Sequence, residues 1–185
     1  LSNYIQGSPE DQSYVAGLVA KGALNAVHFT ADDLDGVFAK LAAAGAKVAL
    51  NFAHGKDAAV ETFAEFTDRG YEGGLFQADV TQEKQVQKLC ADVGKKLGQI
   101  DILVVNATPA QPQKPIELYD WAFYQQMLDF FVKSPFLLTR AVLPQMKQRR
   151  WGRIVNIGSE VFRRGVPNFS AYVAAKGAQT GWTRS

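Results

Sequence analysis

The order of secondary-structure patterns along this 185-residue chain constrains its fold more than any other feature. Short apolar runs alternate with longer segments in which apolar side chains recur every three or four positions. Such runs are typical of strands buried on both faces of a parallel sheet. The alternation predicts an α/β fold with a doubly wound, Rossmann-like parallel sheet, right-handed crossovers and helices on both faces. Strands are expected at residues 26–30, 47–52, 74–78, 102–105 and 153–157.

The segments between these strands are expected to form helices, at residues 8–22, 34–44, 57–69, 81–97, 120–147 and from 170 onward. In the helix at 57–69, Val60, Phe63 and Phe66 are expected to face the core. The apolar stripe from Val86 to Leu97 marks the buried face of a helix that Thr81 is expected to cap.

The two ends of the chain are unusual. We expect residues 1–185 to form a single domain, with residues 1–24 as an atypical N-terminal extension. The chain begins at Leu1 and stops at Ser185 within a helical pattern, which suggests a fragment. The sheet is therefore expected to be incomplete at its C-terminal end.

Composition argues against several classes of protein. Hydrophobic residues make up 47% and charged residues 21%, a globular balance, and the net charge of +2 gives no basis for nucleic-acid binding. Cys90 is the single cysteine and only two histidines accompany it, so neither a disulfide nor a zinc site is expected. Without a long apolar run or a signal segment, we expect no membrane span and a cytoplasmic location.

Ser159, Tyr172 and Lys176 carry the strongest chemical signal. Tyr172 and Lys176 are four residues apart and share one face of the predicted helix, while Ser159 follows the strand at 153–157. An unperturbed phenol has a pKa near 10, and a nearby ammonium lowers it toward the range useful for acid/base catalysis. Taken alone, a Tyr-x-x-x-Lys pair is more often an ordinary feature of a helix surface.

The surroundings of these residues resemble the classical short-chain dehydrogenase/reductase family. The similarity includes the stretch Gly152–Ser159, the spacing from Ser159 to Tyr172, and the sequence Tyr172-Val-Ala-Ala-Lys176-Gly. It extends over about residues 46–185. The resemblance implies that Ser159 orients the substrate oxygen and Tyr172 is the acid/base. It also implies that Lys176 lowers the pKa of Tyr172 and holds the nicotinamide ribose.

Two further stretches are similar to cofactor-binding motifs of this family. Asp79-Val80 resembles the acidic dipeptide that contacts the adenine, and Asn106-Ala107 matches half of an Asn-Asn-Ala-Gly motif. The resemblance implies that these four residues bind the cofactor. From the residues alone, Asp79 is equally well read as a turn residue before Thr81, and Asn106 as one that closes a turn.

The end of the strand at 47–52 bears on the choice of cofactor. An acidic side chain there would bind the ribose hydroxyls of NAD and repel the 2′-phosphate of NADP. This chain has Phe52 instead, followed by His54 and Lys56. The sequence therefore favours NADP(H) over NAD(H), although His54 and Lys56 are also consistent with a solvated loop.

Three features depart from the family pattern. The region Thr30–Gly36 has one glycine where a glycine-rich turn should approach the diphosphate. Phe131 stands where the family has an asparagine that helps to hold a water in the proton relay. Ser13–Gly17 faintly resembles a segment that belongs near the other end of the family's chain, so an ordinary helical extension and a permuted origin both stay open.

The sequence therefore predicts an NAD(P)(H)-dependent oxidoreductase that reduces a small-molecule ketone or oxidises an alcohol. Pro135 and Pro144 are expected to kink or break the helix at 120–147, and that helix is implied to pair with a symmetry mate in a homodimer or homotetramer. One alternative is a dehalogenase-like enzyme, although halohydrin dehalogenases carry arginine where this chain has Lys176. The other is a non-catalytic, nucleotide-binding homologue.

Overall fold

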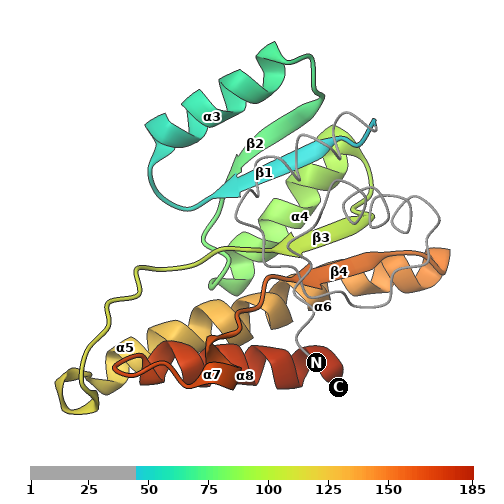
Figure 1. Ribbon diagram of the computed structural model, residues 1–185. Coiled ribbons are helices and arrows are strands. Elements are labelled where there is room, and N and C mark those ends of the chain that lie inside the picture. The colour runs from blue at the N-terminus through green and yellow to red at the C-terminus, as the bar shows by residue number, and fades with distance from the viewer. Residues whose placement is uncertain (1–44) are drawn as a thin grey trace, which may run out of the picture.

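The computed structural model describes residues 45–185 of the chain (Figure 1). The expected helices at 8–22 and 34–44, the strand at 26–30, the altered glycine turn at 30–36 and the segment Ser13–Gly17 lie outside these residues. Within them, every expected strand and helix is present to within a few residues at each end.

The described strands form two parallel pairs. β1 (Val48–Phe52) pairs with β2 (Gly73–Gln77), and β3 (Ile102–Val105) pairs with β4 (Arg153–Asn156). The first pair is tight at its start, because a Cβ on Gly73 would lie 2.4 Å from the carbonyl oxygen of Val48. In both pairs the carboxyl ends of the strands lie at the same edge, as parallel pairing requires.

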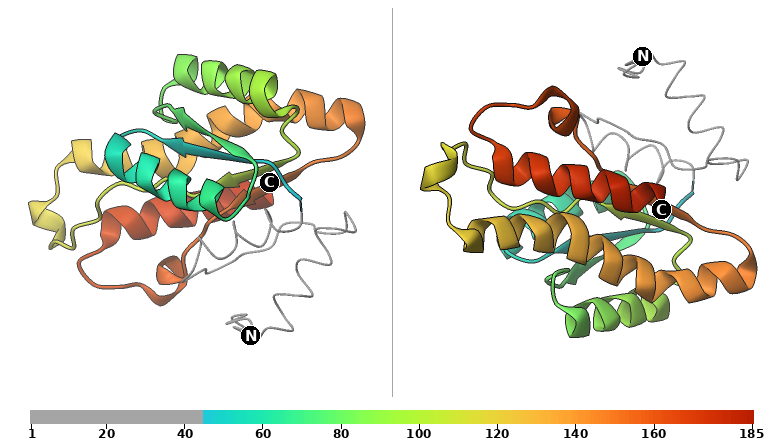
Figure 2. Two further views of the ribbon diagram at one scale, coloured as in Figure 1. Left: turned by 90° about the horizontal axis from the view of Figure 1, so that it is seen from above. Right: turned by 90° about the horizontal axis from the view of Figure 1, so that it is seen from below.

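Helices follow each described strand. They are α3 (Lys56–Asp68), α4 (Glu83–Leu97), η1 (Ile116–Leu118), α5 (Trp121–Leu128), η2 (Asp129–Lys133), α6 (Ser134–Arg149), α7 (Val161–Arg164) and α8 (Ser170–Arg184). Seen from below in Figure 2, α4, the α5–α6 helix and α8 form a row that covers one face of the strands, whereas α3 lies over the other face in the view from above. The arrangement is the expected one of helices on both sides of parallel strands.

The buried apolar side chains occur where the helical stripes predicted them, with one exception. Val86, Leu89 and Val93 pack with strand and α6 residues in the main core cluster. Phe66 is buried in a smaller cluster, with Phe63 packed against it. Val60 was expected to face inward, but 47% of it is exposed. It is the first residue of the apolar stripe of α3, and it is not part of the cluster around Phe66.

The start of α4 also differs from expectation. Gln82 is the N-cap residue, and no side chain accepts a hydrogen bond in capping. The Thr81 hydroxyl donates instead to Oδ1 of Asp79 at 2.7 Å, and the Thr81 backbone N–H donates to the same oxygen at 2.9 Å. Thr81 therefore belongs to the turn that leaves β2, because the carboxylate two residues earlier is the better acceptor for its hydroxyl.

The long helix continues through both prolines. Residues 121–149 are helical throughout, with a π-helical segment, η2, immediately before Pro135. The N–H of Ser134 donates to the carbonyl of Asp129, five residues earlier. This wider turn lies where Pro135, which has no N–H, interrupts the α-helical hydrogen bonds. The expected break is thus accommodated as a π turn, and Pro144 lies inside α6.

The difference between Val60 and Val86 gives a test of the core. Val86, which is 1% exposed, and Val60 both lie on helices, so the substitution to alanine changes helix propensity equally in both. Val86→Ala is expected to lower the free energy of unfolding by about 2 kcal/mol more than Val60→Ala, because it removes buried methyl groups and leaves a cavity. Urea denaturation measures both values, and equal effects would contradict this core assignment.

Candidate active site

Four of the residues predicted to form the site lie at or just after the carboxyl ends of the strands. Phe52 ends β1, Asp79 follows β2, Asn106 follows β3, and Ser159 follows β4. Hydrogen bonds extend each strand pair past its last ladder residue: the N–H of Ala78 donates to the Phe52 carbonyl at 2.9 Å, and the N–H of Ile157 donates to that of Val105 at 3.0 Å. Ligands of doubly wound sheets bind beyond these carboxyl ends.

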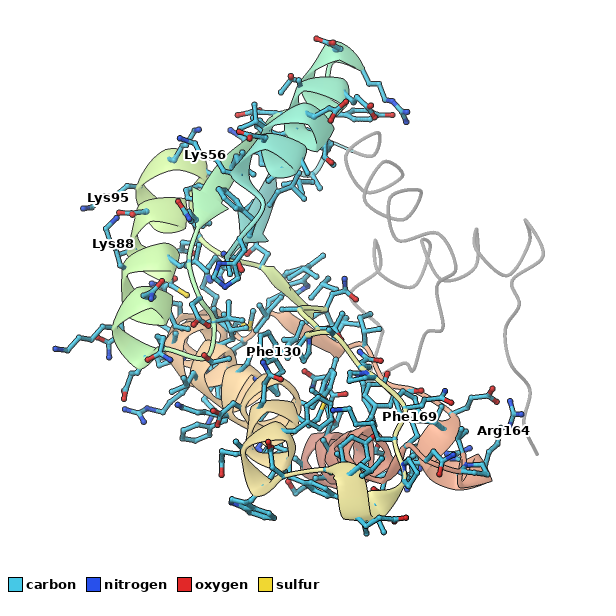
Figure 3. All side chains as sticks on the ribbon, turned by 90° about the vertical axis from the view of Figure 1, so that its left-hand side faces the viewer. Lys56, Lys88, Lys95, Phe130, Arg164 and Phe169 are labelled. Carbon is cyan, nitrogen blue, oxygen red and sulfur yellow. The ribbon has the colours of Figure 1, made fainter. Side chains whose placement is uncertain are left out.

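Tyr172 lies on the first turn of α8 among aromatic side chains. Its ring stacks on Phe169 with 4.7 Å between centroids and meets the edge of Phe131 at 5.3 Å. The Ser159 side chain lies in the loop after β4, where its Oγ accepts from the Val161 N–H at 3.4 Å, and it is near enough to Tyr172 to lower the pKa of the phenol. Figure 3 shows Phe169 beside the start of α8, whereas Lys88 and Lys95 project from the outer side of α4, away from this site. The structure thus places the predicted serine and tyrosine near one another.

Lys176 lies one turn further along α8 and is only 4% exposed. Its Nζ donates to the Ile157 carbonyl at 2.5 Å and to Oε1 of Gln179 at 3.0 Å. The same nitrogen lies 4.1 Å from the ring centroid of Phe131 and 5.8 Å from that of Tyr172. Its ammonium is therefore directed into the space between α8, η2 and the end of β4.

Burial shifts the pKa values of both ionisable groups away from their charged forms. Burial raises the pKa of Tyr172 above 10.0, and the nearby Ser159 hydroxyl offsets this only in part. Burial also lowers the pKa of Lys176 from 10.5 to about 8. The sequence predicts a lowered pKa for Tyr172, and in this structure the shift is upward because loss of solvent outweighs the stabilisation of the phenolate.

Side-chain hydrogen bonds join α8 to the end of β4. Asn156 is 7% exposed, and its Nδ2 donates to the Thr183 hydroxyl at 3.1 Å. That hydroxyl donates to the backbone carbonyl of Gln179 at 2.7 Å. The Asn156–Thr183 bond and the one from Lys176 to Ile157 connect α8 to the end of β4 at two levels, and the Thr183–Gln179 bond lies within the helix. They fix the position of Tyr172 and Lys176 relative to Ser159.

The predicted cofactor-binding residues differ in what they expose. The Asp79 carboxylate accepts two hydrogen bonds from Thr81, as expected for a turn residue. Val80 is 5% exposed and packs in the main core. Asn106 and Ala107 are exposed after β3. Phe52 is half-buried at the end of β1, close to the N-terminus of α3. From Val80, then, only the backbone is available to a ligand.

A shallow hollow of about 410 Å³ lies between η1, the segment that leads into α8 and the first turn of α8. Its lining includes Ile116, Glu117, Asn168 and Val173. The two segments are joined by Tyr119, whose hydroxyl donates toward the Asn168 carbonyl at 3.0 Å. The hollow has an apolar wall and one carboxylate, beside the helix that carries Tyr172.

Residues 45–185 contain no helix that has both the length and the apolar character needed to cross a bilayer. Nor do three or more His, Cys, Asp or Glu side chains gather anywhere in this part of the chain to form a metal site. Around Tyr172 and Lys176 the site consists of hydroxyl, ammonium, amide and aromatic groups.

The sequence did not identify Gln179 as part of the site. It is 2% exposed and accepts a hydrogen bond from Lys176. A signal was available, since Gln179 lies three residues after Lys176 and so shares its helix face. Phe131 was noted as a departure in the proton relay, and the structure shows that its ring contacts both Lys176 and Tyr172.

Comparison with known proteins agrees with this geometry. Residues 36–185 match the family described as short chain dehydrogenase. The chain belongs to that family. It is 35% identical over 147 residues to a 3-oxoacyl-[acyl-carrier-protein] reductase of Synechocystis sp., an alignment that covers 78% of this chain and 58% of the relative.

Two further proteins are similar over about three quarters of the chain. A 2-dehydro-3-deoxy-D-gluconate 5-dehydrogenase of Formosa agariphila is 29% identical over 137 residues, covering 74% of this chain and 52% of the relative. The crystal structure of an NAD⁺-bound xylitol dehydrogenase superimposes with a TM-score of 0.67 at 31% identity, covering 71% of this chain and 50% of that one. The chain thus spans little more than half the length of these relatives, and the Rossmann-like fold is established.

The burial of Lys176 predicts how stability depends on pH. Between pH 8 and 10.5 the unfolded chain keeps a lysine proton that the folded protein has released, so the free energy of unfolding rises with pH. A shift of this size corresponds to at most about 3 kcal/mol. Lys176→Met removes the ionisable group, so the variant is expected to be more stable than the wild type at neutral pH. This difference in the free energy of unfolding should shrink between pH 8 and 10.5, because only the wild type gains stability there.

Urea denaturation between pH 7 and pH 10 measures the two stability curves. Tyr172 contributes the opposite trend only above its ordinary pKa of 10.0, which leaves the lower window to Lys176. Parallel stability curves for the wild type and Lys176→Met would show that burial does not lower the pKa of Lys176.

Proposed function

We propose that the protein is an NAD(P)(H)-dependent oxidoreductase that interconverts a carbonyl group and an alcohol, with Tyr172 as the acid/base. The observation that carries this proposal is the buried Lys176 ammonium 5.8 Å from the ring centroid of Tyr172, with Ser159 nearby. Family membership and the oxidoreductase names of the relatives support the class of reaction.

The residues at the strand ends are compatible with a dinucleotide. An ammonium has three N–H donors, and Lys176 uses two of them on Ile157 and Gln179, which leaves one for a ribose hydroxyl. Asn106 and Ala107 expose polar backbone and side-chain groups at the same edge of the sheet. When bound, the nicotinamide supplies the hydride donor or acceptor.

The side chains of this protein then handle the proton. Ser159 holds the substrate oxygen by a hydrogen bond from its hydroxyl, and Tyr172 gives that oxygen a proton during reduction or takes one during oxidation. The Lys176 ammonium favours the phenolate form of Tyr172 when both are charged. The rings of Phe131 and Phe169 on either side of Tyr172 limit the access of water to the phenol.

For the cofactor, the end of β1 favours NADP(H). Phe52 places no carboxylate beside the adenosine 2′ position, and His54 and Lys56 are exposed in the turn that leads into α3. A positively charged loop at a helix N-terminus favours an additional phosphate. The substrate is proposed to be a small hydroxy or oxo compound that enters by the hollow next to Val173.

The proposed assembly is a homodimer or homotetramer. Trp121 is 70% exposed and Phe136 is 43% exposed on the helix formed by α5, η2 and α6. Large exposed apolar side chains on one helix are typical of a surface that associates with another copy.

The role of Tyr172 is tested by Tyr172→Phe. Turnover is expected to fall by at least about 100-fold, because the ring stays but the transferable proton is lost. Binding of NADPH, followed by fluorescence, should change little. Tyr71→Phe is the matched control, since Tyr71 packs in the separate cluster with Phe66. Turnover that survives Tyr172→Phe would exclude Tyr172 as the acid/base, and a wild type that binds nucleotide without turnover would favour the non-catalytic alternative.

The cofactor assignment is tested by Phe52→Asp. The wild type is expected to have a higher kcat/KM with NADPH than with NADH. The variant should shift this ratio toward NADH by about 10-fold or more, because a carboxylate accepts hydrogen bonds from ribose hydroxyls and repels a 2′-phosphate. An unchanged ratio would mean that the end of β1 does not contact the adenosine ribose.

A further inference from the structure

The ammonium of Lys176 lies in a recess formed by neutral groups. Phe131 and Gln179 are each 2% exposed, and they contact Nζ from η2 and from α8 respectively. The Ile157 carbonyl, at the end of β4, is the third contact. In the part of the chain that the structure describes, no carboxylate forms an ion pair with Lys176.

Such a recess stabilises a buried cation in two ways. Amide and backbone carbonyl oxygens accept its N–H groups, which replaces part of the lost hydration. The face of an aromatic ring within 6 Å attracts a cation through its quadrupole, and this attraction grows when the pair is desolvated. At 4.1 Å, the Phe131 ring lies well within that range.

The π-helical segment η2 explains how a side chain of the long helix reaches this position. The five-residue hydrogen bond from Ser134 to Asp129 widens the helix around Phe131, immediately opposite α8. The ring is then in contact with both members of the pair, its face toward Lys176 and its plane nearly perpendicular to that of Tyr172, at 82°. Phe131 has no hydrogen-bonding group, so it holds no water there.

We propose that Phe131 and Gln179 are positioning residues that fix the Lys176 ammonium beside Tyr172 and set the pH at which Lys176 gains or loses its proton. Neither residue touches the reacting atoms, and both act through Lys176. The catalytic consequence rests on the oxidoreductase function proposed above, whereas the positioning itself does not.

The ionisable groups on the neighbouring elements have other partners or are exposed. Asp129 accepts a hydrogen bond from Gln125, Lys133 is exposed, and Glu160 and Arg164 pair with each other. Among the side chains that contact the Lys176 nitrogen, Tyr172 is the one that titrates. Substitutions at Phe131 or Gln179 should therefore shift the titration midpoint of Lys176 with little contribution from other charged groups.

The titration of Lys176 tests this directly. In protein labelled with ¹³C at the lysine ε position, the signal of Lys176 is assigned by its loss in Lys176→Arg, and its midpoint is expected near 8. Gln179→Met removes the acceptor at similar volume and should lower the midpoint by about one unit. Phe131→Leu removes the aromatic face and should lower it by about half a unit to one unit. Gln179→Glu should raise it above 10.5, the ordinary value for lysine.

Matched controls separate this effect from general destabilisation. Gln87→Met changes an exposed glutamine of α4, and Phe63→Leu changes a phenylalanine in the separate cluster near β1. Both should leave the Lys176 midpoint unchanged. Because Gln179→Glu is predicted to shift the midpoint upward and the other two variants downward, loss of folding in one variant does not remove the test. Midpoints that stay within 0.2 units in all three folded variants would overturn the proposal.

The pH profile of kcat gives the second readout. The alkaline limb should move in the same direction and by a similar amount as the NMR midpoint, with a smaller effect on KM for the nucleotide. Shifted midpoints in a protein without turnover would support positioning and contradict the proposed oxidoreductase function. Turnover that depends on Tyr172, with midpoints unmoved by these variants, would support the function and contradict the positioning.

Discussion

The burial of a single ammonium group connects the parts of this site. Lys176 is carried by α8, but its contacts come from the end of β4, from η2 and from the next turn of its own helix. A buried cation without such partners would be strongly disfavoured, so each of these elements has to be in place for α8 to dock. The docked helix in turn carries Tyr172 to the loop with Ser159. The geometry of the proposed acid/base is thus a consequence of how Lys176 is accommodated.

The same burial creates opposing demands on the two groups. Loss of solvent disfavours both the phenolate of Tyr172 and the ammonium of Lys176, so it raises the pKa of Tyr172 above 10.0, lowers that of Lys176 to about 8, and moves the two values apart. A base is available only if the phenolate becomes accessible near neutral pH, and the nearby ammonium is the group that stabilises it. The usefulness of Tyr172 therefore depends on Lys176 retaining its proton. Neutral partners that favour the ammonium, without forming an ion pair with it, leave its charge free to act on the phenol.

Local patterns predicted most of the described fold because the spacing of apolar residues indicates which face of a helix or strand is buried. The runs at 47–52 and 102–105 became strands, and the stripe through Val86 became the inner face of α4. The predictions that were wrong concern one hydrogen-bond partner and one buried side chain. Thr81 hydrogen-bonds to Asp79 and so does not cap α4, and Val60 lies at the edge of its stripe. The upward shift in the pKa of Tyr172 depends on burial by residues distant in sequence, which spacing does not reveal.

Phe131 and Gln179, the two buried side chains around Lys176, constrain each other's substitution. Phe131 fills its position with a ring that neither donates nor accepts a hydrogen bond, so the polar contacts of Lys176 must come from elsewhere. Gln179, one turn further along α8, supplies an acceptor from the same helix as the lysine. The pairing makes each residue costly to change alone: without the ring the ammonium loses an attractive surface, and without the amide it loses an acceptor in a dry environment. Phe131 is compatible with a charged Lys176 because the Gln179 amide and the Ile157 carbonyl supply the acceptors that the ring lacks.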